Sequence, residues 1–229
     1  MQAVILAAGR GTRMGDLTNE IPKPLLRIGG RPILEYTLDN LPREIDEVIF
    51  IVGYKGEMIR KYFGKEYKNR KIRYCEQTDF NGTAGAVCLA KDLLADKFLV
   101  LMGDDLYHKK DLEKLLRHDL ALLVKEMENN TRFGAVETDS DGNLKQVVEF
   151  KFLKNKKSGN LVNIGAYLIN KDFFEYPLVP VSDKEFGLPQ TLAQMADKYK
   201  IKAVKADFWH PNGHKEDLIK GEKVISFFK

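Results

Sequence analysis

QAVILAAGRGTRMG, residues 2–15, is the stretch that decides the fold, because an apolar run passes directly into a glycine-rich loop. The run at 2–8 is short and ends at glycine, which predicts a buried β-strand. The same pattern recurs at 48–53 (VIFIVG) and at 98–103 (FLVLMG). The sequence therefore predicts at least three buried strands, each of which runs into a loop at its carboxyl end.

Segments with helical spacing separate these strands. Helices are predicted at 33–41, 55–63 and 83–94, and a further strand at 71–75. Strands that alternate with helices predict an α/β fold, with a mostly parallel sheet and helices on both faces. After about residue 120, strands separated by turns are predicted as antiparallel additions to the same sheet, at 133–138, 144–150 and 161–169. Helices at 188–199 and 214–227 complete one predicted domain over residues 1–229, with a flexible loop at 154–159.

The composition and net charge narrow the classes of function. The chain has 229 residues, of which 31% are charged, and a formal net charge of +4. This balance suits an enzyme that handles anions but is too weak for a nucleic-acid-binding surface. No apolar run is long enough for a signal peptide or a membrane span. Cys75 and Cys88 form no CxxC pair. We therefore expect a cytoplasmic protein with reduced thiols and with neither nucleic acid nor a membrane among its partners.

The loop after the first strand has the residues of a polyphosphate site. Gly9 and Gly11 allow a sharp turn that brings backbone N–H groups against phosphates. Arg13 and Lys23 supply positive charge, and the prolines on both sides of Lys23 predict an extended segment there. The spacing is neither that of a Walker A loop nor that of a dinucleotide fingerprint, which would need glycine at Met14. The alternative is a surface loop whose arginine and lysine are solvated.

A second segment, Gly103-Asp104-Asp105, follows the predicted strand at 98–102. A carboxylate at a strand end is a usual ligand for Mg²⁺ that also holds phosphates. The alternative is an aspartate that caps a turn or a helix. Because ligands bind beyond the carboxyl ends of the strands in open α/β sheets, both segments are expected to meet at one edge.

In sequence order, these motifs resemble the signature of the nucleoside-diphosphate-sugar pyrophosphorylases, the sugar-phosphate nucleotidyltransferase family. The resemblance covers almost the whole chain and rests on LAAGRGTRM at 6–14, PKPL at 22–25, PILEY at 32–36, Gln77, GTAGA at 82–86, GDD at 103–105, VEF at 148–150, NIG at 163–165 and Trp209. It implies a GT-A-like, Rossmann-like fold. It also implies a nucleotide-binding half at about 1–120 and a sugar-phosphate-binding half at about 121–229.

The resemblance also implies roles for individual residues. Arg13 would hold the β- and γ-phosphates, Lys23 would bridge the attacking and attacked phosphates, and Asp104 would bind Mg²⁺. Gln77 would read the base of UTP or dTTP, although it could also be a solvated residue at a strand end. The nucleotide-binding residues implied are Leu6, Ala8, Gly9, Gly11, Thr12, Arg13, Gln77, Gly82 and Thr83.

Sugar binding is implied at Glu149, Lys151, Asn163 and Gly165. Glu149 could instead face solvent from a strand. Many relatives have lysine directly after this glutamate, whereas Phe150 stands here. Lys151 is one position later, on what would be the opposite face of a strand.

The second metal ligand of the family also departs from its pattern. Pro211 stands where the family commonly has an aspartate two residues after the tryptophan. Asn212 is the nearest residue with a side-chain oxygen, so we expect it to make a weaker second metal contact. Asp207 and Asp217 are the alternatives.

The chemistry implied needs no general base. A phosphate monoester has a second pKa of about 6, so its oxygen is already ionised at neutral pH. The sequence thus predicts a Mg²⁺-dependent enzyme that joins an NTP, UTP or dTTP favoured, to a sugar 1-phosphate and releases pyrophosphate. The alternatives are a cytidylyltransferase acting on a non-sugar phospho-alcohol and a catalytically silent regulatory homologue. The oligomeric state is left open.

Overall fold

The computed structural model covers residues 1–229 and describes all of them except 129, 153–160 and 229. The flexible loop predicted at 154–159 lies outside the described residues. The strands are β1 (Gln2–Ala7), β2 (Arg27–Ile28), β3 (Arg31–Pro32), β4 (Glu47–Val52), β5 (Glu66–Tyr67), β6 (Arg70–Glu76), β7 (Lys97–Met102), β8 (Leu106–Tyr107), β9 (Leu120–Glu126), β10 (Ala135–Thr138), β11 (Leu144–Val148), β12 (Leu161–Asn170), β13 (Ile201–Lys205) and β14 (Trp209–His210). The α-helices are α1 (Leu17–Glu20), α2 (Ile33–Asp39), α3 (Gly56–Phe63), α4 (Gly82–Cys88), α5 (Lys109–Leu115), α6 (Leu188–Gln194) and α7 (Lys215–Val224).

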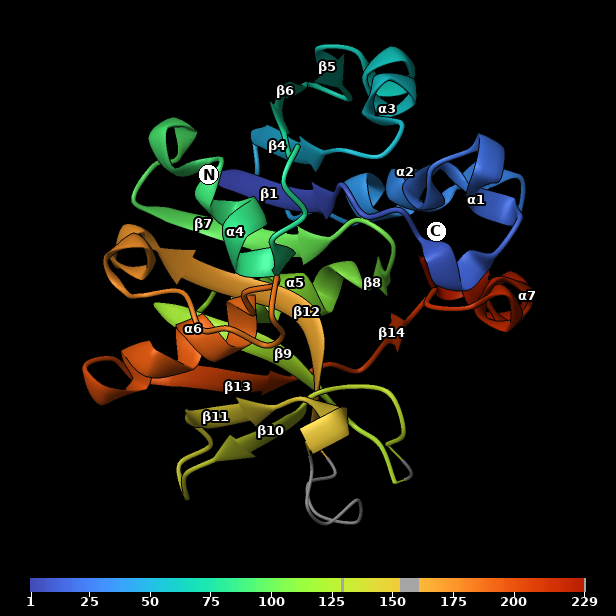
Figure 1. Cartoon of the computed structure of the whole chain (residues 1–229). Coiled ribbons are helices and arrows are strands. Elements are labelled where there is room, and N and C mark those ends of the chain that lie inside the picture. Colours follow the sequence, from blue (N-terminus) through green and yellow to red (C-terminus); the bar gives the residue numbers. More distant parts are fainter. Residues whose placement is uncertain (129, 153–160, 229) are drawn as a thin grey trace.

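One mixed sheet organises the molecule (Figure 1). Its centre is parallel, in the order β7-β1-β4-β6, and Leu6 of β1 lies opposite both Ile51 and Met102. Strand β12 joins β7 in the antiparallel direction, and β9 and β10 both pair with β12. The predicted mixed α/β sheet is confirmed. Because β1, β4 and β7 are parallel, their carboxyl ends share one edge of the sheet.

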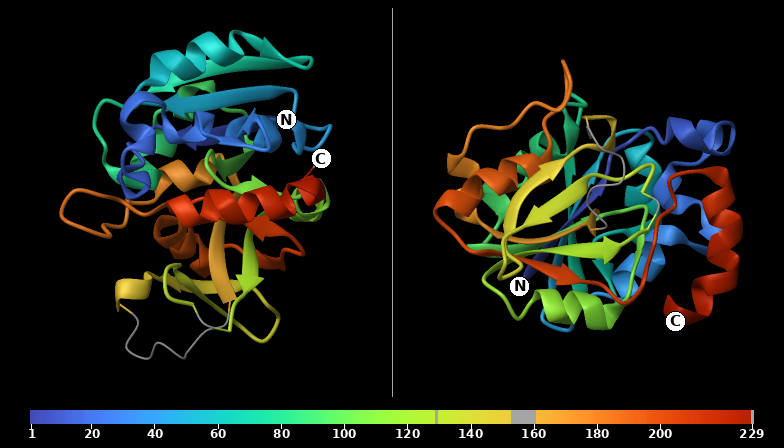
Figure 2. Two further views of the ribbon diagram at one scale, coloured as in Figure 1. Left: turned by 90° about the vertical axis from the view of Figure 1, so that its right-hand side faces the viewer. Right: turned by 90° about the horizontal axis from the view of Figure 1, so that it is seen from below.

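Helices cover both faces of this sheet, as the alternation along β1 shows. Ile5 belongs to an apolar cluster with residues of α2, α3 and α5, whereas its neighbour Val4 belongs to a cluster with residues of α4 and α6. Figure 2 shows the sheet between these two helical layers. Successive side chains of a strand point to opposite faces, so an apolar run such as 2–8 is buried on both sides. No helix in the described part of the chain is both long and apolar enough to cross a bilayer.

Several predicted elements are shorter in the structure. The helix predicted at 83–94 ends at Cys88, and the one predicted at 188–199 ends as an α-helix at Gln194. The strand predicted at 144–150 ends at Val148, and a 3₁₀ turn follows at Phe150–Phe152. The inference that Lys151 lies on a strand face is therefore wrong.

Strands β9 and β13 and helix α5 were not predicted from the sequence. The run LALLVKE of β9 is apolar without a clear period, so helix and strand cannot be told apart locally. The five-residue β13 is partly exposed and pairs with β9 in parallel. Both strands form because they pair with other strands in the tertiary structure, and the spacing of apolar residues along the sequence does not indicate such pairing.

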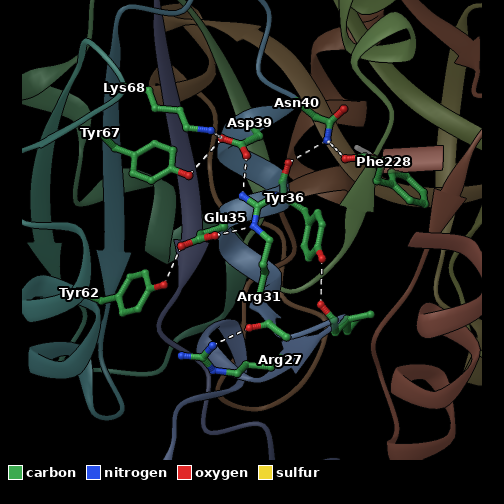
Figure 3. Close-up of polar contacts among 12 residues, drawn as sticks. Arg27, Arg31, Glu35, Tyr36, Asp39, Asn40, Tyr62, Tyr67, Lys68 and Phe228 are labelled. Atoms are coloured by element: carbon green, nitrogen blue, oxygen red, sulfur yellow. Dashed lines mark hydrogen bonds and ion pairs between the residues drawn. The ribbon is translucent and has the colours of Figure 1, made fainter. Parts of the chain in front are cut away.

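A polar network fixes α3 and β5 against α2 (Figure 3). The carboxylate of Asp39 accepts hydrogen bonds from Arg31 Nη2 at 2.6 Å, Lys68 Nζ at 2.7 Å and the Tyr67 hydroxyl at 3.1 Å. Tyr62 adds a hydrogen bond to Glu35 at 2.6 Å. Burial tends to raise the pKa of Asp39, but these donors outweigh it and lower that pKa below its usual value.

We expect Asp39→Asn to lower the free energy of unfolding by about 1–2 kcal/mol at pH 7, because the substitution removes the charge from these hydrogen bonds. The loss stays this small since the site is partly exposed and solvent screens the charges. A carboxyl with a lowered folded pKa stabilises the fold above its unfolded pKa, and this contribution is lost as pH falls through the folded pKa. The deficit of the variant should therefore shrink on acidification. Urea unfolding at pH 7 and at about pH 2, below the lowered pKa of Asp39, measures this deficit. Asp46→Asn, an exposed partner of the N-terminal amine, is the control. An equal loss in both variants would contradict the stabilising role of Asp39.

Candidate active site

A cavity of about 360 Å³ opens at the shared carboxyl edge of the sheet. The ends of β1, β6 and β7, the glycine-rich loop and the start of α4 form its walls. Ten of the residues implied as nucleotide-binding or catalytic line it: Leu6, Ala8, Gly9, Gly11, Arg13, Lys23, Gln77, Gly82, Thr83 and Asp104. The lining does not include Thr12, Glu149, Lys151, Asn163, Gly165 or Asn212. The structure thus gathers the nucleotide-side residues in one place, as expected for ligands at the edge of an open α/β sheet.

The glycine-rich loop folds into one short 3₁₀ turn, Thr12–Met14. Gly11 has φ +65°, a left-handed conformation that favours glycine, and its carbonyl accepts a hydrogen bond from the Thr18 hydroxyl. Met14 is fully buried and anchors the turn, while Arg13 beside it is exposed at the cavity. The anchored turn therefore fixes where the arginine emerges.

Lys23 is buried rather than solvated, so the alternative of a loose surface lysine is wrong. The segment is not fully extended: Pro22 is extended, but Lys23 begins a 3₁₀ turn that Leu26 N closes on the Lys23 carbonyl at 3.0 Å. The ammonium of Lys23 forms an ion pair with Asp104. This partner neutralises a cation that would otherwise be costly to bury.

Asp105, which the sequence analysis did not single out, organises the loop after Trp209. Its carboxylate accepts hydrogen bonds from Trp209 Nε1 at 3.1 Å and from Asn212 N at 3.2 Å. Loss of hydration and the charge of Asp104 raise the pKa of Asp105 to about 7, against the opposing effect of Lys23. The only sequence signal for this residue is its place next to Asp104.

Asn212 is the residue expected to make the second metal contact beside Asp104. Asn212 is fully buried, and its Nδ2 donates to the Asp104 carbonyl at 3.0 Å. Its Oδ1 is buried and has no partner among the described residues. The Asn212 amide oxygen and the Asp104 carboxylate are hard donors of the kind Mg²⁺ takes, and the unpartnered buried oxygen of Asn212 is the feature that fits an ion at this place.

The two alternative aspartates already have partners. Asp207 accepts a hydrogen bond from Lys114 Nζ at 2.6 Å. Asp217 receives both terminal nitrogens of Arg132, at 3.2 and 2.8 Å, and the main-chain N–H of His214. One oxygen of Asp207 and both oxygens of Asp217 are thus taken by structural contacts.

The residues implied for the sugar side lie outside the cavity lining. Glu149 accepts a hydrogen bond from Gln190 Nε2 at 2.7 Å, and Lys151 Nζ donates to the Val181 carbonyl at 3.1 Å. Asn163 donates to the Tyr167 hydroxyl at 2.7 Å and accepts from Gly165 N at 3.3 Å. The sugar roles of these residues stay predictions.

Gly165 lies directly behind one wall of the cavity. A Cβ at this residue would come 2.5 Å from Cγ of Met102, which lines the cavity. With φ +75° it also sits where a bulge interrupts the pairing of β12 with β9.

The cavity also has lining residues for which the sequence predicted no individual role: Ala7, Pro24, Phe80, Ala86, Met102, Glu185 and Gly213. Glu185 arrives through a loop at 179–187, drawn in orange and projecting from the molecule in Figure 2. Phe186 fixes this loop to α4, because its N–H donates to the Asn81 carbonyl at 2.8 Å and its carbonyl accepts from Ala84 N at 3.0 Å. A Cβ at Gly82 would come 2.5 Å from the Phe186 carbonyl, so only glycine permits this approach. No local sequence signal could have placed Glu185 here.

Comparison with known proteins places this site in a family. Residues 2–226 match the family model described as "Nucleotidyl transferase". The chain is 36% identical over 229 residues to the "Bifunctional protein GlmU" of Methanocaldococcus jannaschii, covering 98% of this chain but 54% of that protein. It is 34% identical to the "D-glycero-alpha-D-manno-heptose 1-phosphate guanylyltransferase" of Campylobacter jejuni, covering 95% of this chain and 96% of that protein.

Solved structures share the fold. A "UDP-glucose pyrophosphorylase complexed with UDP-glucose" superposes with a TM-score of 0.82 at 21% identity, covering 100% of this chain and 99% of that chain. A "Putative Glucose-1-Phosphate Thymidylyltransferase from Bacillus anthracis" gives a TM-score of 0.83 at 20% identity, covering 98% of this chain and 94% of that one. With the motifs gathered at the cavity and the match over nearly its whole length, this chain belongs to the sugar-phosphate nucleotidyltransferase family.

Proposed function

We propose that this protein transfers a nucleotidyl group from an NTP, with UTP or dTTP favoured, to a sugar 1-phosphate, and so forms an NDP-sugar and pyrophosphate. The observation that carries the proposal is one cavity lined at once by Gln77 and Gly82, by the cations Arg13 and Lys23, and by Asp104. Two polyanions must be held in line for this reaction, and these groups supply the charges needed.

The proposed reaction needs groups that position and neutralise charge, and it needs no general base. An oxygen of the sugar phosphate attacks the α-phosphorus of the NTP, a new P–O bond forms, and the bond to the β-phosphate oxygen breaks as pyrophosphate leaves. Arg13 holds the leaving β- and γ-phosphates, and Lys23 neutralises charge that develops between the attacking and attacked phosphates. Mg²⁺, held by Asp104 and Asn212, would supply further neutralisation of the polyphosphate when bound.

We assign nucleotide binding to the half at about 1–120 and sugar-phosphate binding to the half at about 121–229. Glu149, Lys151, Asn163 and Gly165 are the proposed sugar-side residues. Asn163 and Gly165 lie on β12, the strand that pairs with β7 directly behind the cavity wall. Lys151 lies beside the loop that carries Glu185, since its Nζ donates to the Val181 carbonyl. Glu149 bonds to Gln190 of α6, the helix that follows this loop.

A guanylyltransferase is the second candidate, and Glu185 is the observation that favours it. A carboxylate can only accept hydrogen bonds when ionised. Guanine offers two adjacent donors, N1–H and the 2-amino group, whereas uracil and thymine offer one. The relative from Campylobacter jejuni is named as a guanylyltransferase.

A matrix of NTPs against sugar 1-phosphates, read as pyrophosphate release, tests the function. We expect Mg²⁺-dependent turnover with UTP or dTTP ahead of GTP, ATP and CTP. A clear GTP preference that Glu185→Gln weakens would establish the guanylyl alternative instead. A preference for CTP with phosphocholine-type acceptors would establish the cytidylyl alternative. No pyrophosphate from any pair, with folded protein, would support a catalytically silent homologue.

A further inference from the structure

The side-chain amide of Gln77 is held by Asn81, which does not itself line the cavity, and by the main-chain carbonyl of Gly82. Gln77 follows β6 directly, is buried, and donates its main-chain N–H to the Val52 carbonyl at 2.7 Å. Its Nε2 donates to Asn81 Oδ1 at 3.2 Å and lies 3.4 Å from the Gly82 carbonyl. Gln77 lines the cavity, whereas Asn81 does not.

These partners decide which way the amide faces. A main-chain carbonyl can only accept, so the Gly82 oxygen requires the nitrogen of the Gln77 amide on its side. The Oε1 atom then lies on the other side of the amide, and among the described residues no donor bonds to it. Gln77 thus presents an acceptor, not a donor, to a bound ligand.

Asn81 occupies a slot that exists only because residue 85 is glycine. A Cβ at Gly85 would lie 2.0 Å from Asn81 Oδ1 and 2.4 Å from its Cγ, which no side chain can tolerate. The main chain of Asn81 is fixed separately, because its carbonyl accepts the Phe186 N–H at 2.8 Å. Gly85 therefore leaves room for the Asn81 side chain, and Asn81 in turn sets the orientation of the Gln77 amide.

We infer that Asn81 is a positioning residue for base selection: it fixes the Gln77 amide so that Oε1 meets the central ring nitrogen of the base. This inference rests on the proposed function and names the substrate class within it. Uracil, thymine and guanine carry a hydrogen on that ring nitrogen and can donate to Oε1. Cytosine and adenine carry a lone pair on that nitrogen, so it and Gln77 Oε1 would be two acceptors facing each other with no proton between them. NTPs of the first group are therefore accepted, and CTP and ATP are rejected.

Loss of Asn81 would release this selection. Without Asn81 only the longer contact to Gly82 orients the amide, and an amide is nearly the same shape after a half-turn. A turned amide offers its nitrogen, which can donate to N3 of cytosine. Selection built on a buried hydrogen bond is strong because the wrong base leaves polar groups unpaired.

The test is the ratio of kcat/KM for UTP to that for CTP, with one sugar 1-phosphate, in four proteins. We expect a ratio of about 10² or more in the unaltered protein. Asn81→Ala should lower the ratio about tenfold or more, chiefly through CTP, while turnover with UTP persists. Asn81→Asp, which can still accept from Nε2, should restore most of the ratio. Gly85→Ala should displace the asparagine amide and lower the ratio as Asn81→Ala does.

Calorimetric affinities for UTP and CTP on the same four proteins separate this inference from the proposed function. An unaltered protein that binds UTP over CTP but yields no pyrophosphate would contradict the transferase reaction and leave base selection intact. An unchanged ratio of affinities in both Asn81→Ala and Gly85→Ala would overturn the role of Asn81. An unaltered protein that binds CTP more tightly than UTP would overturn it as well.

Discussion

Asp104→Ala is expected to remove nearly all turnover, a loss of about 10³-fold or more in kcat, because a metal clamp on a polyphosphate contributes several kcal/mol to the transition state. Asp104 is the carboxylate at the carboxyl end of β7 that lines the cavity and pairs with the buried Lys23. Pyrophosphate release at saturating NTP and sugar 1-phosphate, measured over a range of Mg²⁺, gives the size of the loss. Asp96→Asn is the matched control, since this exposed carboxylate precedes the opposite end of the same strand.

The companion substitutions separate the candidate second ligands. Asn212→Ala should raise the Mg²⁺ concentration needed for half-maximal rate and leave measurable turnover, because one carboxylate and the nucleotide still hold the ion. Asp207→Ala and Asp217→Ala should leave that concentration unchanged, since Asp207 already pairs with Lys114 and Asp217 with Arg132. An unchanged Mg²⁺ curve for Asn212→Ala beside a shifted curve for either aspartate would refute the assignment.

Lys23→Ala and Arg13→Ala are each expected to reduce kcat/KM by about 10²-fold or more, the scale of losing a charge that stabilises a transition state. Both side chains line the cavity, one buried and one exposed. Initial rates at subsaturating NTP measure the effect. Near-normal rates in either variant would contradict the proposed role of that residue in phosphate binding.

The thermal stability of these variants should differ. Arg13 is exposed, so Arg13→Ala should leave the melting temperature almost unchanged. Lys23 is buried against Asp104, so Lys23→Ala also removes packing and an ion-pair partner. Lys23→Met keeps most of the volume of the side chain. A loss of activity in Lys23→Met equal to that in Lys23→Ala would show that the charge, not the packing, is what the reaction uses.

Local sequence pattern was enough to predict several residues that line the cavity. The loop from Gly9 to Met14 and the aspartate after β7 could be found because each directly follows an apolar run that ends at glycine. Gln77 was placed by its resemblance to a family motif, and the structure adds that it is buried rather than solvated. The end of β11 at Val148 could not be found, since the apolar pattern continues through Phe150 while the chain turns.

The sequence by itself determined that the runs at 2–8, 48–52 and 98–102 form buried parallel strands, because an apolar run of strand length needs cover on both faces. That alone brings the glycine-rich loop and Asp104 to one edge. Only the tertiary structure decided what each charge meets there. Lys23 pairs with Asp104, and Arg132 pairs with Asp217, across 81 and 85 residues of sequence. No local period encodes contacts between residues so far apart, because they depend on how strands and loops pack against one another in space.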